Sequence, residues 1–275
     1  MDYSLLLLTL LGLGIGTLGT MIGAGGGFIL VPILILFFPD LSPGIITAIS
    51  LAIVAANASV GTVAYMNSKK IDYKAGLIFA LTTIPGSVLG VFISKHIPKE
   101  EFDILFGIVL IALSVYLFLK GGKRKNNNSI SQEGAIKKHL IDKHGNVYDY
   151  SYNLKWGIII SALVGFFSPL LGIGGGIIHV PAMVEWLHFP VHIATATSHF
   201  ILAIMSLVSV VVHFFDGSYS DPKTLQLIGW MALGVIPGAF LGAKLSHLVK
   251  GTFIIKALAI SLAIVGGRIL ISAIF

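Results

Sequence analysis

Hydrophobic residues form ten runs along the chain, as a pattern of five that occurs twice. The runs are separated by short segments with glycine, proline or charged residues, which mark the ends of helices. Several runs carry no charge over about 20 residues, the length needed to cross a hydrocarbon layer of about 30 Å. The pattern predicts helices over residues 4–22, 27–38, 44–66, 74–94 and 102–119, and again over 155–171, 176–188, 193–215, 224–246 and 252–274.

The apolar runs favour helices over the other structure that spans membranes, the β-barrel. A barrel strand alternates apolar and polar residues, and runs such as 104–119 do not. With 56% hydrophobic and 11% charged residues, the chain is too apolar for a water-soluble fold. We therefore predict an all-α polytopic membrane protein, multi-pass in the cell (inner) membrane and in contact with the lipid bilayer.

Charged residues concentrate in one long polar stretch and in short loops. Residues 120–153 are typical of a flexible connector, which divides the chain into a first repeat at 1–119 and a second at 154–275. Lysines in the connector and in the loop at 69–74 place that face in the cytoplasm. The formal charge of +6 comes from such loops, so we expect no nucleic-acid partner.

Three motifs recur in the same order in both halves, at offsets of 149, 148 and 152 residues. They indicate two homologous repeats, a frequent design in secondary transporters. The first pair is GAGGGFILVP at 23–32 and GIGGGIIHVP at 172–181, the second is TAISL at 47–51 and TATSH at 195–199, and the third is IPG at 84–86 and 236–238.

The glycine motif leaves two topologies open. If runs 4–22 and 27–38 together make one crossing, each repeat crosses four times and the repeats are parallel. If they form a re-entrant pair, each repeat crosses three times and the repeats are inverted. The distribution of lysine and arginine does not separate these topologies. We predict inverted repeats, because helices broken by glycine often accompany inversion in transporters.

The glycine runs also predict a substrate site. Each glycine costs a helix about 1 kcal/mol relative to alanine, so three in succession indicate a break. Open backbone at membrane depth is tolerated where it is buried in protein or lines a cavity. A new helix begins after each break, and its N-terminal N–H groups can bind an anion. The residues that would form this site are Gly25, Gly26, Gly27, Gly174, Gly175 and Gly176.

An alternative is that these glycines only allow helices to pack closely, as small residues often do in membranes. However, Pro32 and Pro181 follow the two glycine runs at the same distance, and each frees a further backbone carbonyl. Close packing does not require these prolines. We therefore favour a break that lines a cavity.

Polar side chains near the motifs are further candidates for the substrate site. His179 and His199 replace Leu30 and Leu51 of the first repeat, and a histidine inside the membrane can donate to an oxyanion or relay a proton. Alternatively, His179 caps a carbonyl freed beside Pro181. Hydroxyl and amide donors follow each break, and serine can instead bond within its own helix. These donors are Ser50, Asn57 and Ser198.

Other motifs argue against a metal site and against ATP. Glu185, His188 and His192 have a helical spacing that suits a transition metal, but Pro190 interrupts that face. We expect no metal and no cofactor. No G-x4-G-K-[ST] sequence is present, so an ATP-driven pump within this chain is not expected. The sequence predicts a transporter rather than an enzyme.

The G-x-G-G-G-x4-P motif in both halves, T-A-x-S after each and I-P-G resemble the TauE/SafE family of sulfite and sulfonate exporters, over nearly the whole chain except the connector. The resemblance implies a secondary carrier of small sulfur-containing anions, such as sulfite, sulfoacetate or other organosulfonates. It also implies coupling to a proton or ion gradient. An anion channel and a histidine-based metal-ion transporter remain alternatives. The oligomeric state is open, with a homo-oligomer among the options.

Overall fold

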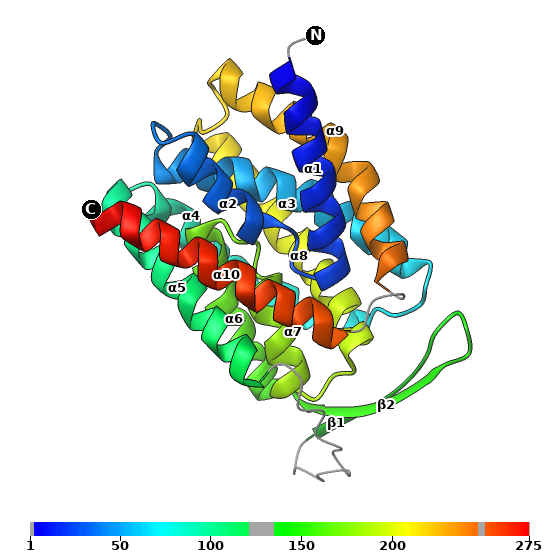
Figure 1. Ribbon diagram of the computed structural model, residues 1–275. Coiled ribbons are helices and arrows are strands. Elements are labelled where there is room, and N and C mark those ends of the chain that lie inside the picture. The colour runs from blue at the N-terminus through cyan, green and yellow to red at the C-terminus, as the bar shows by residue number, and fades with distance from the viewer. Residues whose placement is uncertain (1–2, 121–134, 247–250, 275) are drawn as a thin grey trace.

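The computed structural model describes residues 3–120, 135–246 and 251–274, and these residues form ten helices and one β-hairpin (Figure 1). The first half contains α1 (Tyr3–Ile22), α2 (Gly27–Phe37), α3 (Pro43–Met66), α4 (Tyr73–Ser94) and α5 (Lys99–Lys120). The second half contains α6 (Leu154–Leu171), α7 (Gly176–Glu185), α8 (Val191–Phe215), α9 (Pro222–Leu245) and α10 (Gly251–Ile274). The predicted helices are confirmed, and their ends differ from the observed ones by at most three residues.

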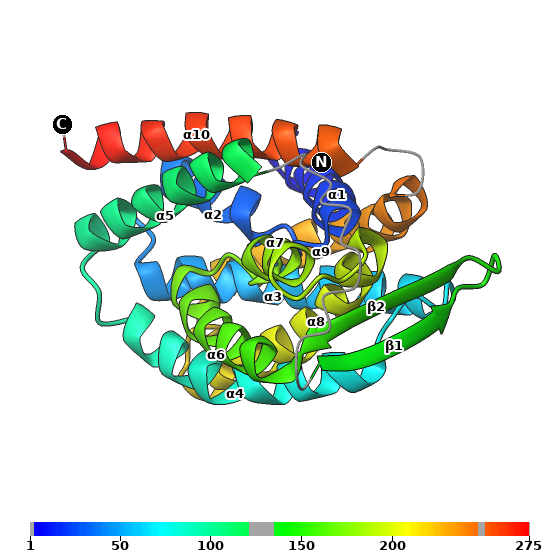
Figure 2. The same ribbon diagram turned by 90° about the horizontal axis from the view of Figure 1, so that it is seen from below.

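Seven helices among the described residues are long and apolar enough to cross a membrane, namely α1, α3, α4, α5, α6, α8 and α9. The helices α2 and α7 are apolar but shorter. The prediction of a helical multi-pass membrane protein is therefore confirmed. The most buried of the seven is α3, at 72% of its span. In Figure 2, α5 and α10 lie along one side, α4 and α6 along the other, and α3 and α7 between them.

The long helices pair across the two halves of the chain. Helix α1 packs along α9, and α4 packs along α6. Both pairs run parallel: Gly12 and Gly16 of α1 lie against Met231 and Val235 of α9, in the same order. Glycine is needed here because an added methyl group would meet the backbone of the facing helix. The glycines of the two I-P-G motifs serve these same contacts, with Gly86 against α6 and Gly238 against α1.

Two other pairs of helices, α5 with α10 and α3 with α8, run antiparallel. In α5 and α10, Gly107 lies against Leu270, while the Ser114 hydroxyl further along α5 donates to the earlier Ala259 carbonyl at 2.6 Å. The contacts between α3 and α8 run in opposite directions in the same way. The late residue Gly61 lies against His199, and the early Ala48 carbonyl accepts from Tyr219, just beyond α8, at 3.0 Å.

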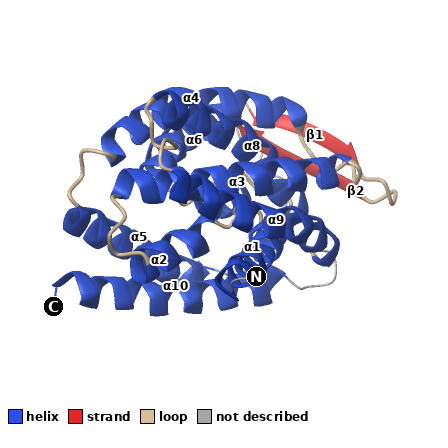
Figure 3. Cartoon of the chain, turned by 90° about the horizontal axis from the view of Figure 1, so that it is seen from above, coloured by secondary structure: helices blue, strands red, loops and turns tan. Residues whose placement is uncertain are grey.

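The connector contains a β-hairpin where the sequence indicated a flexible segment. Strands β1 (Ala135–Ile141) and β2 (Val147–Asn153) pair antiparallel and lie at one edge of the helices (Figure 3). The sequence does carry a sign of β2, since Tyr148, Tyr150 and Tyr152 alternate with polar residues. Tyr150 and Tyr152 pack on Phe189, and their ring centres lie 4.8 and 4.9 Å from the centre of the Phe189 ring. The rest of the connector, residues 121–134, lies outside the described residues.

The hairpin is bound to the loop between α3 and α4. The Lys143 N–H donates to the Ser68 carbonyl at 3.1 Å. Asp72 accepts from the Tyr150 hydroxyl at 2.8 Å and pairs with Lys138 at 3.1 Å. The connector and the lysine-containing loop therefore lie on the same face of the molecule. That this face is cytoplasmic stays a prediction.

Candidate functional site

The two glycine runs break the helices as predicted. Helix α1 ends at Ile22 and α2 begins at Gly27, while α6 ends at Leu171 and α7 begins at Gly176. Three glycines of each break have φ in the left-handed region, where glycine carries no Cβ penalty. Their φ angles are +86°, +75° and +86° at Gly23, Gly25 and Gly26, and +68°, +77° and +64° at Gly172, Gly174 and Gly175.

The two breaks contact each other directly. A methyl group on Gly27, the first residue of α2, would lie 2.5 Å from the Gly172 carbonyl oxygen. Likewise, a methyl group on Gly176, the first residue of α7, would lie 2.6 Å from the Ala24 Cα. The third glycine of each run is therefore needed for close approach, and the preceding glycines for backbone conformation. The glycine runs therefore both break the helices and let the breaks pack closely, while a cavity lined by the breaks stays a prediction.

The T-A-x-S segment of each half supports the break of the other half. The Ser50 hydroxyl of α3 donates to the Gly172 carbonyl at 2.6 Å, and the Ser198 hydroxyl of α8 donates to the Gly23 carbonyl at 3.3 Å. Both serines are fully buried. Their hydroxyls fix the ends of α6 and α1 rather than bonding within their own helices. Their role as anion donors stays a prediction.

Buried N–H groups collect at the starts of the two short helices. Within the described part of the chain, six of them make no hydrogen bond, and they belong to Gly26, Gly27, Phe28, Gly174, Gly175 and Ile177. Nearly all buried backbone N–H groups in proteins have a partner, so such a cluster suits a bound acceptor. The positive ends of the α2 and α7 dipoles add to the attraction for an anion. Further in, Pro32 and Pro181 lie inside these helices.

Asn57 lies beside the first break. Its Oδ1 accepts from the Thr20 hydroxyl at 2.7 Å, and its buried Nδ2 has no hydrogen-bond partner. A methyl group on Gly19 would lie 2.8 Å from this Nδ2 and 2.5 Å from the Gly26 nitrogen, so the two donors are neighbours. The predicted candidate Asn57 is therefore placed next to the N–H groups of α2.

Ser168 holds the corresponding place at the second break and was not among the predicted site residues. Its buried hydroxyl has no hydrogen-bond partner and would lie 2.9 Å from a methyl group on Gly175. The repeat carried a signal for it. The offset of 149 residues between the glycine motifs aligns Ser168 with Gly19, so the second repeat has a hydroxyl just before its break at a position where the first repeat has a glycine.

The two candidate histidines lie in different surroundings. His199 is fully buried beside Gly61, its Nε2 has no partner, and its ring lies 5.4 Å from that of Tyr65. The Tyr65 hydroxyl donates to the Thr20 carbonyl at 2.9 Å, which links His199 to the end of α1. His179 instead lies against α6, with Nε2 3.0 Å from the Ser161 hydroxyl. This contact differs from the alternative of a cap on a carbonyl beside Pro181, and a role for His179 in the substrate site stays a prediction.

The described residues contain no group of three His, Asp or Glu side chains that could hold a metal ion. Along the sequence Glu185, His188 and His192 have helical spacing, but α7 ends at Glu185 and α8 begins only at Val191. His188 has φ of +60°, which turns the chain between the two helices. The three side chains therefore do not share one helical face.

Comparison with known proteins places these features in a family. The family model described as "Sulfite exporter TauE/SafE" matches residues 8–269. The chain is 35% identical to "Probable membrane transporter protein YunE" of Bacillus subtilis, over 99% of both chains. It is 28% identical to a probable membrane transporter protein of Methanocaldococcus jannaschii, over 89% of this chain and 87% of that one.

A plant protein is also similar. "Sulfite exporter TauE/SafE family protein 3" of Arabidopsis thaliana is 30% identical, over 50% of this chain and 30% of the plant protein. No solved structure matches the chain.

Proposed function

Because the chain belongs to the TauE/SafE family of sulfite exporters and is a membrane transporter, we propose that it exports small sulfur-containing anions such as sulfite or an organosulfonate. The anion binds at the N–H groups of the two helix breaks, and its transport is coupled to a proton or ion gradient. The observation that carries this proposal is the cluster of buried N–H groups without acceptors at the starts of α2 and α7.

The chemistry of this cluster suits a sulfonate or sulfite group. Three oxygens on one sulfur accept hydrogen bonds in several directions, and the cluster offers donors from two helix ends together with Asn57 Nδ2. Each helix N-terminus is equivalent to about half a positive charge, so two together balance about one negative charge. Such a site needs no lysine or arginine at membrane depth, where their insertion is costly.

We further propose that the two halves are inverted repeats, and that transport alternates access to the site between the faces. The antiparallel contacts of α3 with α8 and of α5 with α10 support inversion, because a two-fold axis in the membrane plane reverses the direction of each equivalent helix. In this scheme the breaks move relative to each other, and His199 relays the coupling proton.

The proposal is tested with purified protein in liposomes loaded with unlabelled sulfite. We expect radiolabelled sulfite to accumulate by counterflow, with competition from sulfoacetate and taurine and little from chloride. A channel would show no stimulation by the trans anion, and failure of all these anions to move under an imposed gradient would overturn the proposal.

A variant of the site sharpens this test. Asn57→Asp removes the amide donors and adds a negative charge beside the Gly26 N–H, so anion uptake should fall strongly. Asn67→Asp makes the same chemical change at the exposed end of α3 and serves as the matched control. Equal uptake by the two variants would place the anion elsewhere.

A further inference from the structure

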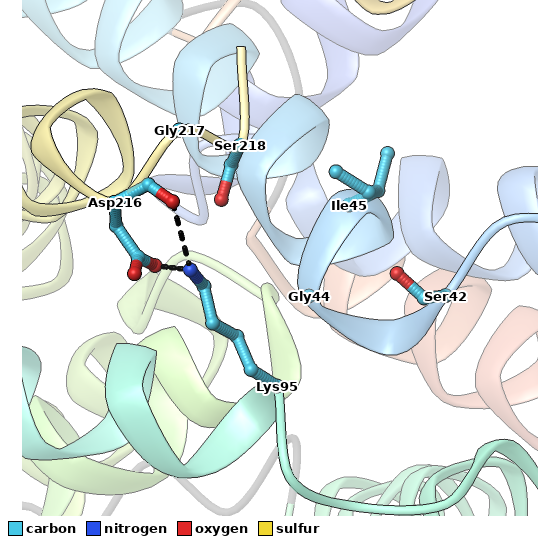
Figure 4. A pocket seen from close by; sticks show the side chains of 7 residues that line it. All are labelled: Ser42, Gly44, Ile45, Lys95, Asp216, Gly217 and Ser218. Atoms are coloured by element: carbon cyan, nitrogen blue, oxygen red, sulfur yellow. Dashed lines mark hydrogen bonds and ion pairs between the residues drawn. The ribbon is translucent and has the colours of Figure 1, made fainter. Parts of the chain in front are cut away.

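A second polar site lies away from the helix breaks. A cavity of about 270 Å³ opens on the face opposite the hairpin, where α3 begins and where α4 and α8 end (Figure 4). It is lined by Ser42, Gly44, Ile45, Lys95, Asp216, Gly217 and Ser218. A sulfite ion has only four heavy atoms, so the cavity accommodates it.

The cavity contains an ion pair between two helix ends. The Lys95 ammonium pairs with the Asp216 carboxylate and also donates to the Asp216 carbonyl at 3.4 Å. Both side chains are 24% exposed. The lysine stem lies over Gly44, where an added methyl group would be 2.9 Å from Lys95 Cγ. The pair therefore links the end of α4 to the end of α8 across the start of α3.

Close contacts connect this cavity to the second helix break. Ser94, the neighbour of Lys95, lies 3.3 Å from the Thr47 hydroxyl, oxygen to oxygen. Thr47 in turn lies against the second break, since a methyl group on Gly172 would be 3.1 Å from the Thr47 Cα. Gly44 of the cavity and Thr47 are three residues apart on α3, so less than one helical turn separates the cavity from the residue that contacts the break.

The ion pair has a chemistry that a substrate anion can replace. An ammonium group has three donors and binds a carboxylate or a sulfur oxyanion in the same way. Without an anion, Asp216 neutralises Lys95, because a partly buried charge is costly when unpaired. The start of α3 brings the positive end of a long helix to the same cavity and offsets part of the negative ends of α4 and α8, which Lys95 also faces.

We propose that this cavity is a second anion site, at which a sulfite or sulfonate displaces the Asp216 carboxylate from Lys95. The displacement separates the ends of α4 and α8, so that the ion pair is closed without the anion and open with it. This inference rests on the proposed function, since it takes the same substrate class. It adds a gate on the face opposite the hairpin.

The test compares Lys95→Gln and Asp216→Asn in the sulfite counterflow assay. Lys95→Gln removes the anion's partner, so KM should rise about tenfold. Asp216→Asn removes the competing carboxylate, so KM should fall. If the ion pair only stabilises the fold, both variants should lose affinity for sulfite. Lys223→Gln, which removes an exposed lysine at the start of α9, is the control and should leave KM unchanged.

The outcomes separate the gate from the general function. If the unmodified protein moves sulfite but both variants lose affinity, or neither changes, the gate is wrong and the proposed function stands. If the unmodified protein moves no sulfur anion, the gate and the proposed function are both wrong. Should Lys95→Gln fail to insert into the membrane, Asp216→Asn decides alone, because the gate predicts a gain of affinity and a structural pair predicts a loss.

Discussion

Replacing Gly27 by alanine tests whether the two helix breaks must touch. Gly27 has no positive φ, so the substitution adds a methyl group without straining the local backbone. That methyl group would lie 2.5 Å from the Gly172 carbonyl oxygen and 2.9 Å from the Ile173 carbonyl carbon. Both are backbone atoms, so the breaks must separate by about 1 Å to reach ordinary contact.

The magnitude follows from two opposing effects. Overpacking of this kind costs about 1–3 kcal/mol, and alanine in place of glycine returns up to about 1 kcal/mol through helix propensity. The net loss lies between about 0 and 3 kcal/mol, and its central value of about 1–2 kcal/mol lowers Tm by about 2–8 °C for a chain of this size. Separation of the two helix starts also weakens anion binding by their N–H groups, so sulfite should raise the Tm of the variant less than that of the unmodified protein.

The assay is thermal unfolding of the detergent-purified protein with and without sulfite. Gly14→Ala is the matched control, because nothing lies within 4 Å of a methyl group at that position of α1. The control should keep or raise Tm and keep the full response to sulfite. If Gly27→Ala matches Gly14→Ala in Tm and in its response to sulfite, the two breaks do not need to touch.

Three further predictions concern single side chains. Ser50→Ala leaves the buried Gly172 carbonyl without its donor and should lower the free energy of unfolding by about 1–3 kcal/mol, measured by denaturation in detergent; an unchanged value would contradict this support. His199→Ala should slow sulfite transport and flatten its pH profile, and a profile that keeps its shape would exclude a proton relay through this residue. Burial acts to raise the pKa of Asp142, but hydrogen bonds from Asn146 and from the His144 N–H lower it to about 2. Its carboxylate therefore stabilises the hairpin above pH 4 and loses this effect as the pH falls towards 2, so the protection of the hairpin amides, measured as exchange relative to the intrinsic rate at each pH, should fall in that window, whereas Asp142→Asn should show reduced protection already at neutral pH.

The sequence predicted the helices well because a membrane offers few alternatives. A run of about 20 apolar residues in lipid must bond its own backbone, so helix positions follow from hydrophobicity alone. Breaks at the two glycine runs followed from the cost of successive glycines. Recurrence of the motifs also indicated which segments are equivalent.

The contacts between segments could not be predicted in the same way. Nothing along the chain says that Ser50 bonds to Gly172 rather than to its own helix, because that choice depends on how the halves pack. For the same reason the contact of His179 with Ser161 of α6 could not be predicted. The hairpin was missed because its alternating tyrosines stand among mixed charges, which made the segment resemble a loop.

The pairing of helices across the halves also bears on how the protein is made. Helix α1 packs mainly on α9, which the ribosome synthesises about 200 residues later, and α4 packs on α6 of the other half. The glycine-rich surface of α1 therefore has no permanent partner while the first half is already in the membrane. Neither half can complete its packing alone, so biogenesis ends only when the second half arrives, whether on the same polypeptide or on a separately translated fragment.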